Sequence, residues 1–224
     1  MGITSSDVRL LESALRLKDI NYVIELGSQN LYLEGCDYQK PPFANEWYES
    51  RGIQYMCIDM AGDNNAIKIN LSQCWYREDY MIFDLVTDFG TSEHVADVEK
   101  FQSTEFHDGH IHSVYPAYEP LENEIAWGYY SVWCNKHNLA KPGGLILSVN
   151  PKTGNWPGHG YTYIDSEFYK SLASRCGYTI HHLRENAAMG NTKDGWNIEC
   201  ILEKKSDNAF ISFDEFQECQ QYRK

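Results

Sequence analysis

Two short apolar runs in the first quarter of the chain each end in residues that could bind a ligand. The first, Tyr22–Gly27, contains Glu25 near its end and closes on Gly27. The second, Ile53–Asp59, closes on the carboxylate of Asp59. Parallel α/β sheets bind ligands beyond the carboxyl ends of their strands, where glycine allows close backbone approach and a carboxylate can accept hydrogen bonds from a ribose. The pattern predicts a site for a nucleoside-containing cofactor.

Two histidines are placed where they could accept a proton from a substrate. His94 follows a predicted strand at the ligand-facing rim, and His159 lies between two glycines in the loop after another strand. The ordinary pKa of imidazole is near neutral pH, which suits general base catalysis. We therefore predict His94 and His159 as catalytic candidates. The alternative for His94 is a role in capping the following helix together with Glu93.

A third group of histidines raises the question of a metal. His107, His110 and His112 form a His-x-x-His-x-His pattern with Asp108 beside them, and histidine and aspartate are common zinc ligands. The spacing is not that of a rigid two-histidine helix site, and no distant residue obviously completes the set. We therefore interpret these residues as part of a substrate-covering segment and predict no metal site.

The hydrophobic periodicity predicts helices and strands in alternation. Helices are expected at residues 6–17, 43–51 and 123–137 and from Asp165 to Cys176, and strands at 22–27, 53–59, 66–71, 81–87, 145–149, 178–183 and 196–203. This alternation favours a Rossmann-like α/β fold, with a mainly parallel seven-stranded sheet and helices on both faces. No clear helix separates the last two strands, so the last strand is expected to be antiparallel.

The chain is expected to form a single domain over residues 1–224, because no repeat or linker divides it. Residues 89–122 interrupt the regular pattern with a long segment rich in histidine and aromatic residues. Structureless connections of this length are uncommon unless they are functional or disordered, and the aromatic residues argue against disorder. We predict a lid or substrate wall there, followed near the end of the chain by a polar tail at residues 206–224.

Composition narrows the classes of partner. The hydrophobic share of 42% and charged share of 23% are typical of globular soluble proteins. No apolar run approaches the roughly 20 residues that span a bilayer. The seven cysteines include no Cys-x-x-Cys pair, so we expect a reduced, cytoplasmic protein. A net charge of −13 disfavours nucleic acid and anionic membranes and favours a cationic small molecule such as a sulfonium cofactor.

The order of these motifs resembles that of a known family. Glu25-Leu-Gly27, Asp59, Phe83-Asp-Leu-Val-Thr87, Ala140-Lys-Pro-Gly-Gly144 and the two closing strands follow one another as in class I S-adenosylmethionine-dependent methyltransferases. The resemblance covers approximately residues 7 to 204. It implies a seven-stranded sheet with an antiparallel last strand, and S-adenosylmethionine as the cofactor.

The resemblance also implies roles for individual residues. The methionine part of the cofactor would face Glu25 and the backbone of Gly27 and Ser28, and Asp59 would bind the ribose hydroxyls. The remaining cofactor contacts would be Met60, Asn70 and Leu71 around the adenine, and Asp88 and Phe89 below the sulfonium.

The expected activity is methyl transfer to an unidentified small-molecule acceptor, a choice favoured by the acidic surface, the aromatic segment and the single-domain size. A protein side chain is the second candidate acceptor. A non-catalytic protein of the same fold is a further alternative, because the turn after Glu25 carries one glycine where the family usually has two or three. An NAD-dependent oxidoreductase is weakened by the absence of a G-x-G-x-x-G motif. The sequence does not predict an oligomeric state.

Overall fold

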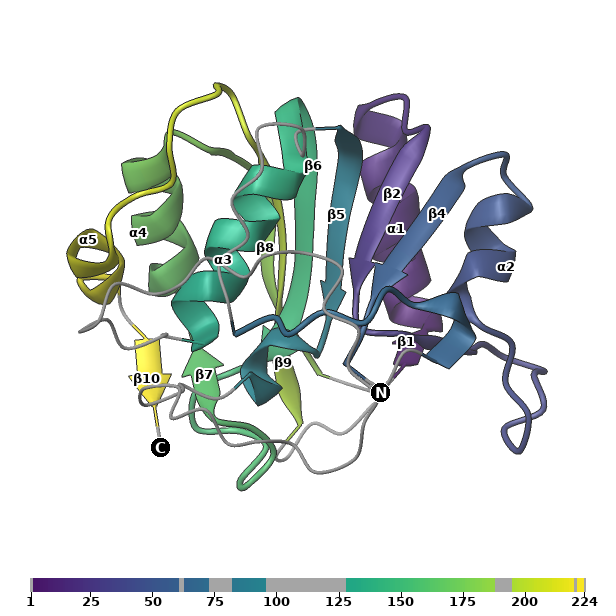
Figure 1. The fold of residues 1–224 in the computed structure, drawn as a ribbon. Coiled ribbons are helices and arrows are strands. Elements are labelled where there is room, and N and C mark those ends of the chain that lie inside the picture. Colours follow the sequence, from purple (N-terminus) through teal and green to yellow (C-terminus); the bar gives the residue numbers. More distant parts are fainter. Residues whose placement is uncertain are drawn as a thin grey trace, which may run out of the picture.

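The computed structural model describes residues 2–60, 63–72, 82–95, 128–187, 195–219 and 221–223. Its centre is a twisted sheet whose strands lie side by side in the order β4, β2, β5, β6, β9, β8 (Figure 1). Their bounds are β2 Tyr22–Leu26, β4 Gln54–Ile58, β5 Phe83–Phe89, β6 Ala140–Pro151, β8 Thr179–Ala187 and β9 Trp196–Glu203. The strands from β4 to β6 are parallel, whereas β9 is antiparallel to both β6 and β8. The prediction that the last strand of the sheet is antiparallel is thus confirmed.

Helices cover both faces of this sheet, as predicted. One face packs against α1 (Ser5–Leu17) and α2 (Ala44–Glu49), and the other against α3 (Gly128–Leu139), α4 (Ser166–Cys176) and α5 (Phe213–Gln217) (Figure 1). Successive strand residues point to opposite faces, so Val23 belongs to the α1 side and Ile24 to the α3 side. Burial of both faces explains why these strands are continuous apolar runs.

Local sequence signals fix the ends of two of the helices. Asp165 accepts hydrogen bonds from the backbone N–H groups of Glu167 and Phe168, which caps α4, and Gly177 ends that helix in a left-handed conformation with φ 69°. At α1, the hydroxyl and the N–H of Thr4 both donate to the Asp7 carboxylate, at 2.6 and 2.8 Å. Side chains that satisfy the free amides of a first turn stabilise a helix start by about 1 kcal/mol.

The predicted third strand at residues 66–71 is wrong. Within the described residues the main sheet has six strands, and this segment contributes a single parallel bridge between Ile58 and Ile67. The 3-10 helix η1 (Asp63–Asn65) precedes it with positive φ angles at Asn64 and Asn65. The carbonyl oxygen of the Asn70 side chain then accepts from Ser72, which bends the chain into a turn. These local bonds compete with strand pairing.

The strand predicted at 145–149 extends further toward the amino end than expected. Phe83 of β5 pairs with Ala140 of β6, and the next pair is Leu85 with Leu145. Residues 141–144 therefore form a bulge within the strand. A Cβ atom at Gly144 would lie 2.8 Å from the carbonyl oxygen of Lys141. Glycine at this position therefore permits the bulge.

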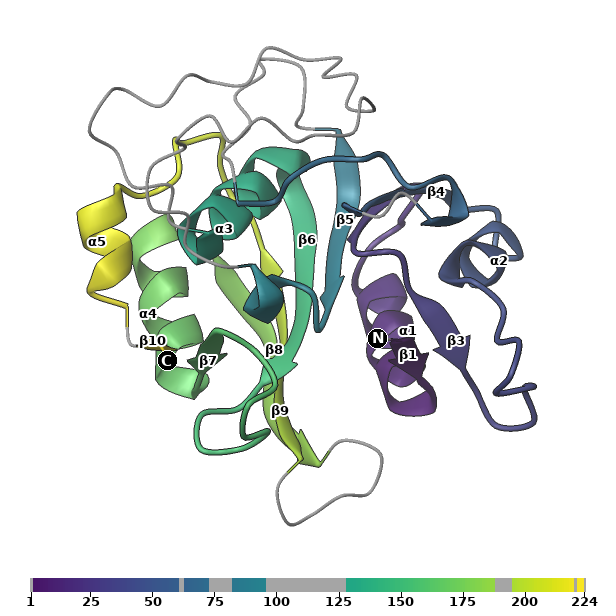
Figure 2. The same cartoon turned by 60° about the horizontal axis from the view of Figure 1, so that its bottom comes forward.

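Two small ribbons were not predicted. Strand β1 (Gly2–Thr4) pairs in parallel with β3 (Asn30–Tyr32), and β7 (Thr162–Ile164) pairs antiparallel with β10 (Gln221–Arg223). The first ribbon brings the amino terminus beside the carboxyl ends of the central strands (Figure 2). The predicted lid lies outside the described residues from position 96 onward, as do residues 123–127 of the predicted helix. No helix in the described ranges is both long and apolar enough to cross a membrane.

Candidate functional site

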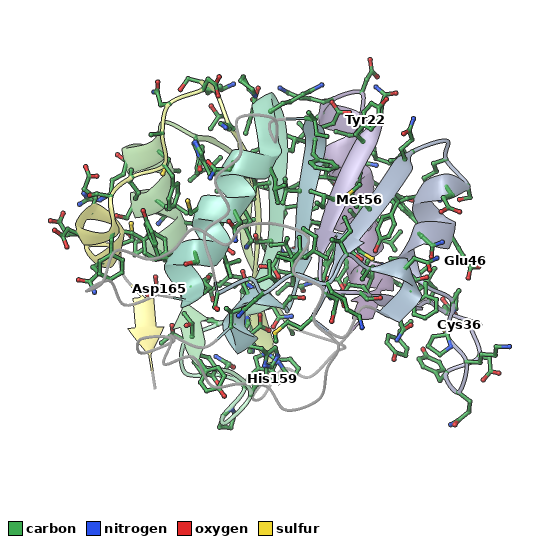
Figure 3. All side chains as sticks on the ribbon, in the orientation of Figure 1. Tyr22, Cys36, Glu46, Met56, His159 and Asp165 are labelled. Carbon is green, nitrogen blue, oxygen red and sulfur yellow. The ribbon has the colours of Figure 1, made fainter. Side chains whose placement is uncertain are left out.

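Several of the predicted ligand-binding residues lie at the end of the sheet where the parallel strands terminate. Tyr22 at the start of β2 and His159 in the loop after β6 lie at opposite ends of the molecule in Figure 3. The end that carries His159 also carries the carboxyl ends of β2, β4, β5 and β6. Ligands bind at this end in parallel α/β sheets.

The turn after β2 is built for close backbone contacts. Gly27 has φ 84°, and a Cβ atom there would lie 2.3 Å from the Thr91 hydroxyl oxygen. Its N–H donates to the carbonyl of Ile58 at 2.7 Å, and the N–H of Ser28 donates to the Asp59 carboxylate at 2.9 Å. The structure therefore brings Gly27, Ser28 and Asp59 together. Whether they contact a cofactor stays a prediction.

Glu25 lies below this turn and is completely buried. Its carboxyl group accepts hydrogen bonds from the hydroxyl groups of Tyr55 at 2.6 Å and Thr87 at 3.3 Å. Burial disfavours the charged form of a carboxyl group. This effect outweighs the two hydrogen bonds and a further one from the Gln29 backbone, so the pKa of Glu25 rises to about 8. In this conformation Glu25 supports the turn from inside the protein.

Asp88, at the end of β5, forms a buried ion pair. Its carboxylate lies 2.6 Å from the ammonium of Lys136 in α3, and both side chains are fully buried. The N–H groups of Thr91 and Ser92 donate to its other oxygen at 3.0 and 3.2 Å. Burial alone would raise the pKa of Asp88, but the Lys136 charge and these donors hold it below the ordinary value. Asp88 thereby fixes the turn that leads into η2 (Ser92–His94).

The residues predicted around the adenine and the sulfonium are dispersed. Met60 is 72% exposed beside Asp59, whereas Leu71 is buried in the core between the sheet and α3. The side-chain oxygen of Asn70 accepts hydrogen bonds from the backbone N–H and the hydroxyl of Ser72. Phe89 is 4% exposed and its ring forms part of a cavity wall.

The two predicted catalytic histidines meet, although they are far apart in the sequence. The rings of His94 in η2 and His159 in the β6–β7 loop lie 4.8 Å apart, edge to face. The Nε2 atoms of both face the same carboxylate oxygen of Glu93, at 3.7 Å from His94 and 3.6 Å from His159. The Glu93 side chain is 2% exposed, whereas the imidazoles are 37% and 34% exposed. The three residues form a cluster with a buried acid and two accessible bases.

The loop that carries His159 is held tightly against η2. The N–H of Tyr161 donates to the carbonyl of Glu93 at 2.8 Å, and a Cβ atom at Gly160 would lie 2.9 Å from Glu93. The side-chain amide of Asn150 in β6 donates to the second carboxylate oxygen of Glu93 at 3.4 Å. Glycine at position 160 thus allows the approach that places the imidazole of His159 beside Glu93.

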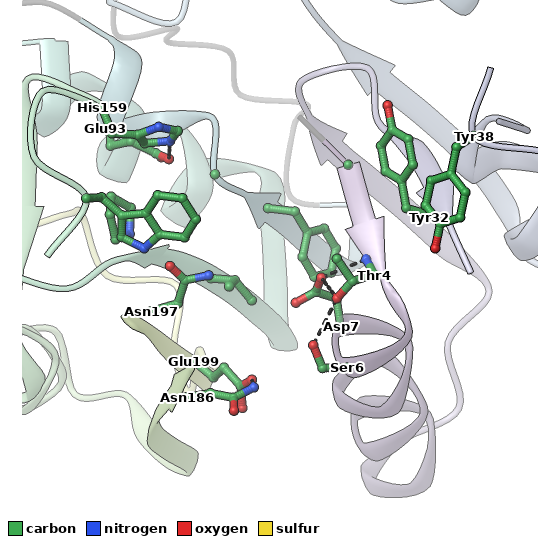
Figure 4. A pocket seen from close by; sticks show the side chains of 16 residues that line it. Thr4, Ser6, Asp7, Tyr32, Tyr38, Glu93, His159, Asn186, Asn197 and Glu199 are labelled. Carbon is green, nitrogen blue, oxygen red and sulfur yellow. Dashed lines mark hydrogen bonds and ion pairs between the residues drawn. The ribbon is translucent and has the colours of Figure 1, made fainter. Parts of the chain in front are cut away.

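A cavity of about 380 Å³ opens beside this cluster (Figure 4). Glu93, Trp156 and His159 line one side, and Tyr32 and Tyr38 lie across the cavity with their rings stacked at 5.9 Å. The remaining walls come from β1, α1, β5, β6, β8 and β9, through Gly2, Thr4, Ser6, Asp7, Phe89, Gly90, Val149, Pro151, Asn186, Asn197 and Glu199. Of this lining, Phe89 and His159 were predicted to face a ligand.

Several site residues escaped sequence reasoning. Tyr32 and Tyr38 lie in a segment that looked like an irregular loop, because the β1–β3 pairing joins two three-residue strands with no periodic pattern of their own. Glu93 stood next to His94 and was interpreted only as a capping residue. The one available signal was its position immediately after the predicted rim of β5.

Comparison with known proteins supports the fold. No family model matches the chain, and a search of curated proteins found no match. Among solved structures, the N-methyltransferase NodS from Bradyrhizobium japonicum WM9 aligns at 12% identity over 89% of this chain and 94% of its own, with a TM-score of 0.52. The cyclase SpnF aligns at 11% identity over 89% and 81%, also with a TM-score of 0.52.

A third neighbour is Burkholderia thailandensis 1,6-didemethyltoxoflavin-N1-methyltransferase, solved with bound 1,6-didemethyltoxoflavin and S-adenosylhomocysteine. It aligns at 13% identity over 90% of this chain and 82% of its own, with a TM-score of 0.49. Many further neighbours are class I S-adenosylmethionine-dependent methyltransferases. The alignments with NodS and SpnF, at a TM-score of 0.52, give the chain a methyltransferase-like α/β fold.

Proposed function

We propose that the protein transfers a methyl group from S-adenosylmethionine to a small molecule bound in the 380 Å³ cavity. One observation carries this proposal. At the end of a methyltransferase-like sheet, the Gly27–Ser28 turn contacts Asp59, and a cavity lined by His159 lies at the same end. The distance of 2.9 Å between the Ser28 N–H nitrogen and Asp59 joins the two strand ends that a nucleoside cofactor would bridge.

The residues at this turn fit the cofactor. The Thr91 hydroxyl lies 2.3 Å from where a Cβ atom of Gly27 would be, so only glycine fits at this close turn, and the buried side-chain oxygen of Gln29 has no hydrogen-bond partner among the described residues. Asp59 would hold the ribose hydroxyls, and the exposed Met60 would contact the adenine. When bound, S-adenosylmethionine supplies a methyl group activated by a sulfonium centre.

The cavity suits a small acceptor. Its volume lies within the range of small-molecule sites, about 300–1,000 Å³. The aromatic rings of Tyr32, Tyr38 and Trp156 can hold a flat molecule. His159 lines the cavity and would contact the acceptor, with His94 beside it, and either imidazole could take the proton of an attacking hydroxyl or amine. The buried Glu93 carboxylate stabilises the imidazolium that results.

The fold by itself does not decide between turnover and binding. SpnF, described as a cyclase, shares this fold to the same degree as NodS, and one fold commonly hosts several reactions. A test of the proposal must therefore measure methyl transfer as well as cofactor affinity.

The first test is a calorimetric titration with S-adenosylmethionine, S-adenosylhomocysteine and NAD. We expect micromolar binding of the sulfonium cofactor and its product, weakened at least about tenfold in Asp59→Ala, because a carboxylate–hydroxyl bond contributes roughly 1.5–3 kcal/mol. Asp214→Ala changes an exposed aspartate in α5 and is the matched control. Binding of NAD alone, or of none of the three, would refute the proposal.

A second test concerns turnover. Release of S-adenosylhomocysteine is measured against a panel of small hydroxyl and amine acceptors. His159→Ala should lower turnover about 10²–10⁴-fold, the typical contribution of a general base, while affinity for S-adenosylhomocysteine stays unchanged. A protein that binds the cofactor but releases no product with any acceptor would be assigned to the non-catalytic alternative.

A further inference from the structure

We propose that Glu93, His94 and His159 bind a divalent transition-metal ion at the edge of the cavity. Each residue offers one ligand atom, and these atoms all lie within 4.8 Å of one another. The existence of this site does not depend on methyl transfer, but the role suggested below for the ion rests on the proposed function.

The geometry is close to that of a bound ion. Bonds of about 2.1 Å from a zinc-like ion to nitrogen and oxygen place tetrahedral ligand atoms about 3.4 Å apart. The Glu93 oxygen lies 3.7 Å from His94 Nε2 and 3.6 Å from His159 Nε2. These two distances exceed the tetrahedral value by about 0.2–0.3 Å, and all three ligand atoms lie within 4.8 Å of one another, so binding of an ion would draw the two partly exposed imidazoles toward each other. Both imidazoles present Nε2, one of the two ring nitrogens that bind metals.

The surrounding residues hold the ligands in place before any ion binds. Asn150 donates to the Glu93 oxygen that faces away from the histidines, and the His159 ring lies against the indole of Trp156 at 5.2 Å. The N–H of His159 donates to the carbonyl of Trp156 at 3.0 Å. Outer contacts of this kind orient metal ligands and raise affinity.

The composition of the cluster indicates which ions it would take. Two imidazoles and one carboxylate suit zinc, iron, manganese or cobalt, whereas Mg²⁺ prefers a shell of oxygen atoms and water. Three protein ligands leave at least one coordination position open, as in catalytic rather than structural zinc sites. Glu93 and His159 line the cavity, so the open position faces a bound acceptor.

This arrangement favours an oxygen acceptor, such as a phenol, enol or other hydroxyl compound that can ligate the ion. A bound cation lowers the pKa of a coordinated hydroxyl. The O–H bond breaks and its proton passes to water in the cavity, because the Nε2 atoms of His94 and His159 are then metal ligands and cannot accept it. The oxygen forms its bond to the methyl carbon as the carbon–sulfur bond breaks, and the sulfur keeps that electron pair. The histidines then act as ligands rather than as bases.

The test uses the full chain after removal of metal with a chelator. Titration with Zn²⁺, followed calorimetrically, and with Co²⁺, followed by visible absorption, should show about one ion per chain. His94→Gln and His159→Gln should each weaken binding more than about tenfold and alter the Co²⁺ spectrum. Both side chains are partly exposed, so these variants should fold, which circular dichroism checks.

His181→Gln is the matched control. His181 also pairs with a glutamate, Glu203, at 2.8 Å, but it lies on β8 and belongs to no metal-ligating group among the described residues. Ion affinity should be unchanged in this variant. Absence of Zn²⁺ binding, equal binding by wild type and the two site variants, or a preference for Mg²⁺ over Zn²⁺ would overturn the proposal.

Parallel titration with S-adenosylhomocysteine separates this proposal from the previous one. Cofactor binding without metal binding would remove the metal site and leave the histidines as bases. Metal binding that depends on His94 and His159 without cofactor binding would support the site and refute the methyltransferase assignment.

Discussion

Glu25 and Asp88 are two buried carboxylates on neighbouring strands that the protein accommodates in opposite ways. In the pairing of β2 with β5, Glu25 stands opposite Thr87 and Leu26 stands opposite Asp88. Glu25 therefore points to the face of α1 and α2, and Asp88 to the face of α3. Hydroxyl groups meet the first carboxyl group, whereas an ammonium meets the second.

The difference shows that burial alone does not determine the charge of an acid. Burial raises the pKa of Glu25 to about 8, which makes its neutral form the main one at neutral pH. The same desolvation acts on Asp88, yet Lys136 and the backbone donors hold its pKa below the ordinary value. A carboxyl group can thus support a turn in either form, as an uncharged acceptor or as half of an ion pair.

The largest expected effect comes from removing the Lys136 charge from the buried Asp88–Lys136 ion pair. Lys136→Met leaves Asp88 buried without its counter-charge, so the free energy of unfolding should fall by about 3–5 kcal/mol. Chemical denaturation followed by circular dichroism measures this change. The double variant Asp88→Asn with Lys136→Met should recover part of the loss, because it removes both charges together.

Lys141→Met provides the control for this experiment. Lys141 also pairs with an aspartate of β5, Asp84. The Lys141 side chain is 45% exposed, whereas that of Asp84 is 4% exposed and also accepts hydrogen bonds from two backbone N–H groups. The loss in this variant should therefore be smaller than in Lys136→Met. Equal losses in the Lys136 and Lys141 variants would show that the Asp88 pair is not buried as described.

The second prediction concerns the pH dependence of stability at Glu25. Because its pKa rises from 4.5 unfolded to about 8 folded, the native state holds a proton that the unfolded state has lost. The free energy of unfolding should therefore fall as pH rises between these values, by about 2–3 kcal/mol from pH 5 to pH 7 relative to Glu25→Gln.

Denaturation of both proteins at a series of pH values tests this prediction. The difference between wild type and Glu25→Gln cancels the contribution of His137, whose pKa burial lowers to about 4 and whose titration therefore also changes stability with pH. Parallel curves for the two proteins would mean that Glu25 is charged in the folded protein, and the contrast with Asp88 would disappear.

The smallest effect is expected at Thr91, which contacts both regions. Its N–H donates to Asp88 at 3.0 Å, and its hydroxyl donates to the carbonyl of Leu26 at 2.8 Å. Thr91→Val keeps the shape and the N–H but removes the hydroxyl, which should cost about 1–2 kcal/mol. A double-mutant cycle with Glu25→Gln measures whether the two turns are energetically coupled; strictly additive effects would show that they are independent.

Sequence reasoning found the elements whose patterns are local. Burial on both faces made the central strands apolar, and Asp165 marked the start of α4. The prediction of a strand at 66–71 failed because the apolar residues there, which include Leu71, face the core from an irregular segment. Periodicity cannot distinguish such burial from that of a strand.

The sequence predicted which residues could form the site but not which of them contact one another. His94 and His159 were singled out separately, but their common contact with Glu93 depends on how two loops pack. Lys136 carried no signal, because a lysine in the last turn of a helix normally reaches solvent and interacts favourably with the helix dipole. Only the tertiary fold shows that it is buried against Asp88.

The position of β9 has a consequence for synthesis on the ribosome. This strand lies between β6 and β8, and β8 pairs with no other described strand of the main sheet. Until residues 196–203 have left the ribosome, β6 has an open edge and β8 has no partner in the sheet. An exposed strand edge is a template for wrong pairing. The roughly fifty residues from the end of β6 to the end of β9 take about 2.5–10 s to make at 5–20 residues per second, and during this time the edge of β6 stays open to wrong pairing.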